Sequence, residues 1–310
     1  MQAAVDVVND SPHPTHKISS AVFTDEFIVT ATNHWPKPIE TRLGRDIRIG
    51  DSSSTIHAET AAILKSSKTE GARICITDPF CPNCAKNIVE AGIKTIYIDH
   101  KGFEKAFWEK SGDNFKNMSM EIVAKAGISV YEIHRKAKKI LPIHEAPADF
   151  IPPEDSPIQI EPCPQNENAF KTLVHDMQQQ YHNRKFVTAM VKTQDSATFC
   201  MTARIHAVTG YTIQDDRDIE TMTNPGHKYS YIQEPMNRLL MATRRKGYAL
   251  LPKYVFCSQV PTSREQVNMV GAGIKKIIIG DPFRARKDTD IEAKNLLTKK
   301  KIINFEDAIL

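Results

Sequence analysis

The feature that most constrains the fold of this chain is a pattern that occurs once in each half. Residues 90–100 read EAGIKTIYIDH and residues 271–281 read GAGIKKIIIGD, so both contain A-G-I-K-x-I-x-I. In the same way, KISSAVF at 17–23 corresponds to KFVTAMV at 185–191. Similarity over such a span predicts two copies of one arrangement of strands and helices in tandem.

The first copy alternates between strand and helix signals. Runs rich in β-branched residues predict strands at 18–23, 26–32, 73–77, 94–98 and 128–133. Helical segments are predicted between them at 54–67, 81–92 and 117–127, the last two ending at glycine. This alternation predicts an α/β layered domain. A length of 310 residues agrees with two such domains at about 150 residues each.

A change in composition marks the expected boundary between the copies. Residues 140–165 contain seven of the 18 prolines of the chain. Proline stiffens extended chain and cannot donate to a strand ladder, so this segment is predicted to be a linker. The predicted division is therefore a first domain at 1–139, a proline-rich linker at 140–165 and a second domain at 166–310.

Composition and charge narrow the class of protein. Hydrophobic residues make up 41% and charged residues 25%, the net charge is +4, and no apolar run approaches the roughly 18 residues of a membrane helix. The first residues lack the pattern of a secretory signal, and six cysteines are too few to suggest a disulfide framework. We therefore expect a cytoplasmic protein with reduced thiols and no membrane partner. The mild positive charge permits a phosphorylated ligand without requiring nucleic acid.

Three residue types that bind zinc stand at the starts of two neighbouring helices. His57 and Glu59 begin one helix, and Cys81 and Cys84 begin the next in a C-x-x-C. A C-x-x-C alone is compatible with a redox pair, a structural zinc site or chance. A structural site would need a fourth ligand of similar spacing, and the chain has no second C-x-x-C. His57, Cys81 and Cys84 are three ligands with an open fourth position, which is typical of a catalytic zinc ion. Residues three apart on a helix share a face, so both cysteine sulfurs can reach one ion.

The sequence His57-Ala58-Glu59 followed by Cys81-Pro-Asn-Cys84 resembles the zinc-dependent nucleoside and nucleotide deaminase superfamily, whose signature is H-x-E…P-C-x-x-C. The resemblance implies a three-layer α/β/α cytidine-deaminase-like fold, here present twice in tandem. It implies zinc as the cofactor, held by His57, Cys81 and Cys84. It also implies Glu59 as the residue that carries a proton from the attacking water to the leaving amine.

Within this superfamily, residues 32–38 (TNHWPKP) resemble the deoxycytidylate deaminase branch. That resemblance implies that Asn33 contacts the sugar, and we assign Trp35 and Ala58 to substrate binding with it. Trp35 either stacks on a base or packs the loop. Four basic residues of the loop offer forked contacts to a phosphate, namely Lys37, Arg42, Arg45 and Arg48.

The second copy lacks this chemistry. When IQEPMNRLL is aligned with IHAETAAIL, Gln233 stands opposite His57 and Pro235 opposite Glu59. Thr262 and Glu265 stand opposite the two cysteines, so the second domain is predicted to be pseudo-catalytic. One departure falls within the first copy, where Phe80 occupies the place of the proline that usually precedes the first cysteine.

Taken together, these features predict hydrolytic deamination of a cytosine nucleotide or nucleoside, similar to dCMP, to the uracil form with release of ammonia. The expected partner is this small molecule, and a homodimer is left open. Two alternatives remain at this point: a deaminase that acts on RNA or DNA, and a catalytically inert regulator stabilised by zinc.

Overall fold

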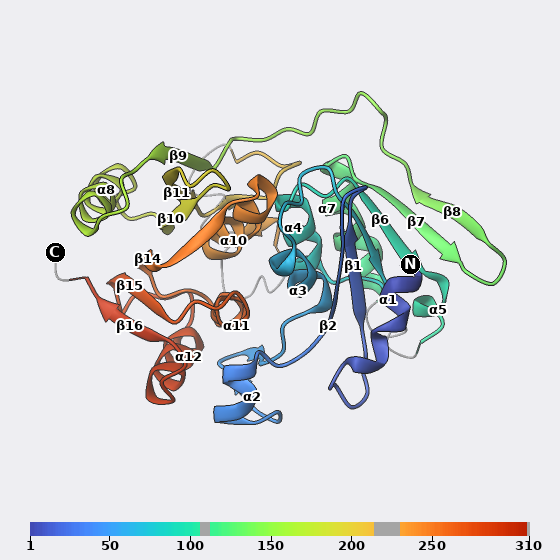
Figure 1. Cartoon of the computed structure of the whole chain (residues 1–310), viewed down its shortest axis with the longest axis horizontal. Helices are drawn as coiled ribbons and strands as arrows, with labels where there is room; N and C mark the ends of the chain where they lie inside the picture. Colours follow the sequence, from blue (N-terminus) through green and yellow to red (C-terminus); the bar gives the residue numbers. More distant parts are fainter. Residues whose placement is uncertain (106–111, 214–229, 309–310) are drawn as a thin grey trace.

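The computed structural model describes residues 1–105, 112–213 and 230–308, and it contains two six-stranded sheets that lie in the two halves of the molecule (Figure 1). Helices cover the sheets, as the predicted α/β class requires. Over the described residues, no helix is both long enough and apolar enough to cross a lipid bilayer.

The first sheet has the strand order β2-β1-β5-β6-β7-β8. Strand β1 is antiparallel to β2 and β5, strands β5, β6 and β7 run parallel, and β8 returns antiparallel at the edge. The bounds are Ser19–Phe23 for β1, Ile28–Thr32 for β2, Arg73–Ile76 for β5, Thr95–Asp99 for β6, Ser129–His134 for β7 and Lys139–His144 for β8.

The second sheet repeats this order as β11-β10-β14-β15-β16, with β9 added outside β11. The directions also repeat, because β10 is antiparallel to β11 and β14 while β14, β15 and β16 run parallel. This repeated order and these repeated directions support the predicted tandem duplication of one α/β fold. The bounds are Ile158–Pro162 for β9, Phe186–Lys192 for β10, Thr198–Arg204 for β11, Ala249–Gln259 for β14, Lys276–Asp281 for β15 and Asn304–Asp307 for β16.

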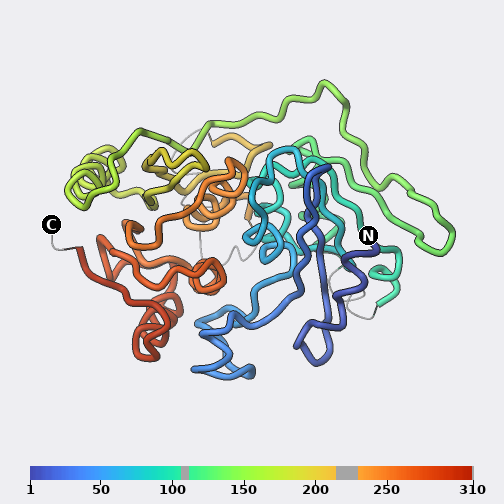
Figure 2. The backbone as a smooth tube through the Cα atoms, in the orientation of Figure 1, coloured from blue at the N-terminus to red at the C-terminus, as the bar shows by residue number. Residues whose placement is uncertain are grey.

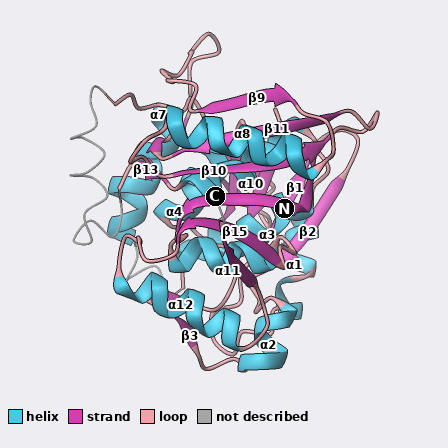
Figure 3. Cartoon of the chain, turned by 90° about the vertical axis from the view of Figure 1, so that its left-hand side faces the viewer, coloured by secondary structure: helices cyan, strands magenta, loops and turns pink. Residues whose placement is uncertain are grey.

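Helices occupy equivalent places in the two halves. The first half contains α1 Gln2–Asp6, α2 Lys37–Leu43, α3 Ala58–Lys65, α4 Pro82–Glu90, α5 His100–Phe103 and, after a π-helical turn at Phe115–Ser119, α7 Met120–Lys125. The second half contains α8 Glu167–Gln180, α10 Pro235–Lys246, α11 Ser263–Gly271 and α12 Asp288–Lys299. Helix α8 packs on one face of the second sheet through a separate apolar cluster that includes Phe170 and Phe256. Figure 3 shows α8 lying over the strands of this sheet. Two short ribbons complete the fold, β3 Arg48–Ile49 with β4 Ser52–Ser53, and β12 His206–Ala207 with β13 Ile232–Gln233.

The proline-rich segment 140–165 differs from the linker predicted for it. Its first part forms β8 against β7, and its last part forms β9 against β11. Prolines are tolerated there because both are edge strands, where a missing N–H need not leave a ladder partner unpaired. Only residues 145–157 connect the two sheets without a strand of their own, and Figure 2 shows this connection arching over the molecule.

The two halves share one continuous hydrophobic core. Helices α3 and α4 pack against α10, and the largest buried cluster contains residues of both halves, such as Ile88 and Leu239. Arg238 of α10 is completely buried in this interface. Its Nη1 lies 2.6 Å from an Oε1 of Glu90, and its Nη2 donates to the carbonyls of His206 (3.0 Å) and Ala207 (2.7 Å).

Replacement of Arg238 by leucine should strongly destabilise the protein, because it leaves the buried Glu90 carboxylate without its partner. We expect the free energy of unfolding to fall by about 3–5 kcal/mol, measured by urea denaturation near neutral pH. The matched control is Arg245→Gln, which breaks a partly exposed ion pair between the halves, with Glu70, and should cost about 0–1 kcal/mol. Equal losses in the two variants would show that the buried pair does not hold the halves together.

Candidate active site

Two helix starts lie side by side beyond the ends of the first sheet's strands. His57 is the N-cap residue of α3, and Cys81 is the N-cap residue of α4, followed by Pro82 in the first turn. Proline is favoured at this place because the first N–H groups of a helix have no partner within the helix. The two helices are tied together by Asn87, whose Nδ2 donates to Thr60 Oγ1 over 3.0 Å.

The three predicted ligands converge at these helix starts. His57 Nδ1 lies 3.2 Å from Cys84 Sγ and 3.6 Å from Cys81 Sγ. The three donor atoms lie within 4.8 Å of one another. Zinc bonds of about 2.3 Å to sulfur and about 2.0 Å to nitrogen at tetrahedral angles place such donors about 3.5 Å apart. The residues present therefore fit one tetrahedral zinc ion, with a fourth position open.

The electrostatics of the three side chains also favour a cation. A hydrogen bond with Cys84, together with the neighbouring His57, lowers the pKa of the Cys81 thiol well below its usual value. Burial disfavours a charged His57, but the Cys81 sulfur outweighs this effect and raises the pKa of the imidazole. The same hydrogen bond, together with burial, raises the pKa of the Cys84 thiol well above its usual value, so the cysteine pair carries one negative charge. An ion of charge +2 that binds both sulfurs would displace the second proton.

Glu59 lies in the first turn of α3, and its carboxyl group forms a hydrogen bond with the Cys84 thiol. Its side chain is only 4% exposed, and burial raises the pKa of its carboxyl group. A carboxyl group of raised pKa exchanges a proton more readily near neutral pH than an exposed one. The position and the proton affinity of Glu59 therefore suit the acid–base role that the motif implies.

The three residues assigned to substrate binding are engaged by contacts within the protein or are buried. The Asn33 Oδ1 accepts from Ser11 Oγ (2.7 Å) and the Ile18 amide (2.9 Å), and its Nδ2 donates to the His16 carbonyl (2.8 Å). Trp35 donates from Nε1 to Ser54 Oγ and stacks on His13, so of the two roles considered for it the structure favours packing of the loop. Ala58 is buried at the start of α3.

Phe80, the residue that departs from the family pattern, belongs to the core. Its ring meets that of Phe115 edge to face at 5.3 Å, and its carbonyl accepts from Ser119 Oγ. The π-helical turn after α5 thus covers the space beside the first cysteine. With phenylalanine at this place, the sulfur atoms of Cys81 and Cys84 and the His57 imidazole nitrogen lie within 4.8 Å of one another.

A pocket of about 380 Å³ opens in front of His57 and Cys81. Of the four basic loop residues considered for a phosphate, only Arg48 is among its described lining residues, while Lys37 and Arg42 line a separate pocket of about 510 Å³. Neither Asn33 nor Trp35 is among the described residues that line it. Sequence reasoning missed the other cations of the pocket, which are Lys86, Arg264, Arg286 and Lys287. A sequence signal was available for Arg286 and Lys287, which lie in the basic segment RARK at 284–287, shortly after β15 ends.

The equivalent place in the second half requires a correction of the sequence alignment by one residue. Glu234, and not Gln233, is the N-cap residue of α10 and so corresponds to His57. When Glu234 is aligned with His57, the hydrogen bond from Asn268 Nδ2 to Asn237 Oδ1 is equivalent to the one from Asn87 Nδ2 to Thr60 Oγ1. The position of Glu59 is then taken by Met236, and its helix begins with Pro235 at the position of Ala58. Hydrophobic periodicity alone did not detect the shift, because both registers place apolar residues inside.

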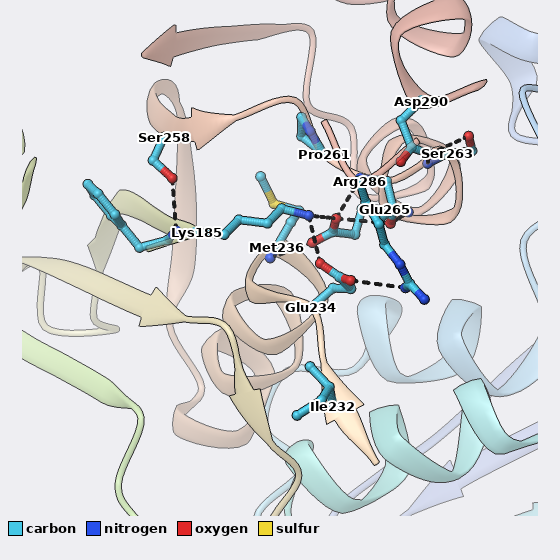
Figure 4. A network of polar contacts seen from close by, with 12 residues as sticks. Lys185, Ile232, Glu234, Met236, Ser258, Pro261, Ser263, Glu265, Arg286 and Asp290 are labelled. Atoms are coloured by element: carbon cyan, nitrogen blue, oxygen red, sulfur yellow. Dashed lines mark hydrogen bonds and ion pairs between the residues drawn. The ribbon is translucent and has the colours of Figure 1, made fainter. Parts of the chain in front are cut away.

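At this equivalent place an ammonium group lies where the first half gathers its ligands (Figure 4). The Lys185 Nζ is 2.6 Å from Glu234 Oε2 and 3.1 Å from Glu265 Oε2. Thr262 and Glu265, opposite Cys81 and Cys84, form a capping box at the start of α11. Burial disfavours the ammonium, but the two carboxylates outweigh it and raise the pKa of Lys185. A lysine and a helix cap therefore hold together the two helix starts of the second half.

Comparisons with known proteins find similarity to deaminases in the first part of the chain. Residues 1–100 match the family model of the cytidine and deoxycytidylate deaminase zinc-binding region. The chain is 39% identical over 75 residues to ComE operon protein 2 of Bacillus subtilis (strain 168), covering 22% of this chain and 40% of that protein. It is 34% identical over 90 residues to the deoxycytidylate deaminase of Enterobacteria phage T4, covering 27% and 41%. The chain thus spans about two fifths of the length of these two curated relatives.

Among solved structures, the dCMP deaminase of the cyanophage S-TIM5, in complex with dCMP and dUMP, is similar with a TM-score of 0.31 and 19% identity. The match covers 43% of this chain and 92% of that one.

Loss of one ligand should abolish metal binding in this protein. We expect Cys84→Ala to lower zinc content, measured by inductively coupled plasma mass spectrometry, from about one ion per chain to near zero. The variant should also unfold at a lower temperature. Cys257→Ala is the matched control, because Cys257 is a buried thiol in β14 that lies among apolar residues. Full zinc content in Cys84→Ala would contradict the assigned ligand set.

Removal of the Lys185 ammonium should destabilise the second half. Lys185→Met leaves Glu265 buried without a cation and Glu234 with Arg286 alone, so we expect a loss of about 3–5 kcal/mol in the free energy of unfolding. The two carboxyl groups would then have a raised pKa in the folded state, so the lost stability should return as the pH is lowered. The exposed pair Lys171–Glu167 supplies the control Lys171→Met. A loss that does not depend on pH would contradict the assigned role of Lys185.

Proposed function

We propose that the protein is a zinc-dependent hydrolase that deaminates a cytosine nucleotide or nucleoside, because its first hundred residues match the family model of the cytidine and deoxycytidylate deaminase zinc-binding region. The observation that carries the proposal is the convergence of His57, Cys81 and Cys84, with the buried Glu59 in the first turn of the same helix that His57 begins. His57 and Cys81 line the pocket. A purely structural zinc site has no use for Glu59, which is not a ligand. This speaks against an inert regulator.

In this proposal each residue has one task. His57 Nδ1 and the two sulfurs would hold the ion, and the two thiolates would balance its charge. When bound, zinc supplies an activated water by lowering the pKa of that water to about 7. Glu59 would accept a proton of this water as the water oxygen bonds to C4 of the pyrimidine. It would then return the proton to the amino group, so that the C4–N bond breaks, ammonia leaves and the oxygen on C4 becomes the uracil carbonyl.

The pocket supports a small substrate. A volume of about 380 Å³ lies within the usual range for small-molecule sites, and the pocket is bounded by both halves of the chain. A single nucleotide matches such a space better than a long nucleic-acid strand, which needs an extended groove with aromatic stacking surfaces. We therefore favour a free nucleotide or nucleoside similar to dCMP.

The wider organisation follows from the same proposal. The catalytic unit is the first half, predicted as 1–139 and extended by β8 to residue 144. The second half, from β9 onward, is proposed to be non-catalytic, because Glu234, Thr262 and Glu265 replace the ligands. A cytoplasmic location and a homodimer both stay predictions.

Glu59→Ala should abolish turnover without loss of the metal. We expect ammonia release from dCMP, followed in a coupled assay, to fall by at least about 10²- to 10⁴-fold, the usual contribution of a general acid–base residue. Zinc content should stay near one ion per chain, because Glu59 is not a ligand.

The companion variant is Glu121→Ala, which removes a partly exposed carboxylate of α7 away from the described lining of the pocket. It should retain the activity of the unchanged protein. Zinc loss in Glu59→Ala would count against the role of Glu59. Absence of any ammonia release from the zinc-loaded, unchanged protein would count against the proposed reaction on this substrate.

A further inference from the structure

The pocket in front of His57 and Cys81 is as much a product of the second half as of the first. Nine of its seventeen described lining residues come from the second half. Arg264 occupies in α11 the place that Asn83 occupies in α4, and both line the pocket. The pocket thus lies between two equivalent helix starts, of which only one carries the metal ligands.

The described lining of this pocket has more cations than acids. Five basic side chains line it, Arg48, Lys86, Arg264, Arg286 and Lys287, against the three acidic side chains Asp51, Glu234 and Asp290. Three of the five cations come from the second half. An excess of positive charge in a confined pocket attracts an anionic group, and arginine forks match the oxygens of a phosphate.

Contacts across the interface hold these second-half cations in place. Arg264 donates from Nη1 to the Thr55 carbonyl (2.7 Å) and from Nη2 to Ser53 Oγ (2.9 Å), just before the helix that His57 begins. Lys287 Nζ lies 2.7 Å from Asp51 Oδ2. The cations are therefore set against the first half before any ligand arrives, which reduces the entropy lost on binding.

Arg286 is positioned by the network that replaces the metal ligands (Figure 4). Glu234 uses Oε2 for the Lys185 ammonium and Oε1 for Arg286 Nη1, at 3.2 Å. Glu265 completes the network through the capping box and through the Met236 amide, which donates to its Oε1 over 2.8 Å. The built-in Lys185 cation thus fixes Glu234, and Glu234 holds the guanidinium at the pocket wall.

We propose that the second half forms the anion-binding wall of the catalytic pocket and that Arg264 and Arg286 recognise the phosphate of a cytosine nucleotide. This inference rests on the proposed function and deepens it. In this account the second half has an ion network around Lys185 in place of a metal site. It contributes specificity for a phosphorylated substrate and does not form a second reaction centre. Arg264 and Arg286 act on the substrate directly, while Lys185 and Glu234 are positioning residues.

The test compares a phosphorylated substrate with its nucleoside. We would measure kcat/KM for dCMP and for deoxycytidine in the unchanged protein and in Arg264→Gln and Arg286→Gln. The unchanged protein should prefer dCMP. Each variant should lower this preference by about 10- to 100-fold, the range expected for loss of one hydrogen bond to a charged group, and mainly through KM for dCMP.

The control separates loss of charge in the pocket from loosening of the interface. Arg245→Gln also removes a contact between the halves, the pair with Glu70, but Arg245 is not among the described residues of the pocket. It should keep the preference for dCMP. Equal kcat/KM on both substrates in the unchanged protein, or an unchanged preference in both pocket variants, would overturn the inference.

Binding without turnover keeps the inference separate from the proposed function. In the Glu59→Ala background, calorimetric titration with dCMP should give a dissociation constant that Arg264→Gln raises about 10- to 100-fold. If no substrate is turned over but this effect on binding is found, the proposed reaction fails and the anion-binding wall stands. If turnover is found and Arg264→Gln leaves the binding of dCMP unchanged, the inference fails and the reaction stands.

Discussion

The meeting of two helix starts is the constraint on which the rest of this structure depends. In each half, two helices begin side by side beyond the sheet, and their first turns bring polar side chains together around a buried point. Helix starts favour negative charge, so thiolates and carboxylates gather there at little cost. The gathered negative charge then requires a cation. In the first half the donor set His57, Cys81 and Cys84 fits a zinc ion, and in the second half Lys185 supplies the charge from within the chain.

The different cations give the two halves different properties. An ion with an open coordination position can activate water, whereas an ammonium that is fully engaged with Glu234 and Glu265 cannot. The second network has an outward-facing oxygen instead, Glu234 Oε1, and this oxygen holds Arg286 at the pocket. A shared core and the buried Arg238–Glu90 pair keep both halves in one arrangement. One side of the pocket therefore carries the metal ligands His57 and Cys81, and the other side carries cations of the second half. Both sides come from equivalent parts of one repeated fold.

Much of this fold could be predicted from the sequence, because the repeat and the glycine-terminated helices are local signals. The grouping of His57, Cys81 and Cys84 could also be predicted. Each lies at the start of a helix, and neighbouring helices of an α/β layer begin side by side. Long-range features were not accessible. Lys185 is distant in sequence from both of its carboxylate partners, and the lining of the pocket depends on how the halves pack. The proline-rich segment was mistaken for linker alone because edge strands tolerate proline. The Asn33 side chain forms hydrogen bonds with Ser11 and His16 of the N-terminal segment, and no sequence pattern predicted these contacts.

The most direct test of this account is an anomalous-scattering measurement at the zinc absorption edge on crystals of the zinc-loaded protein. The account predicts one strong peak within bonding distance of His57 Nδ1, Cys81 Sγ and Cys84 Sγ. It also predicts no peak between Glu234 and Glu265, where the Lys185 ammonium lies. A peak at the second position, or none at the first, would contradict the claim that one repeated fold carries a metal in one half and a built-in cation in the other.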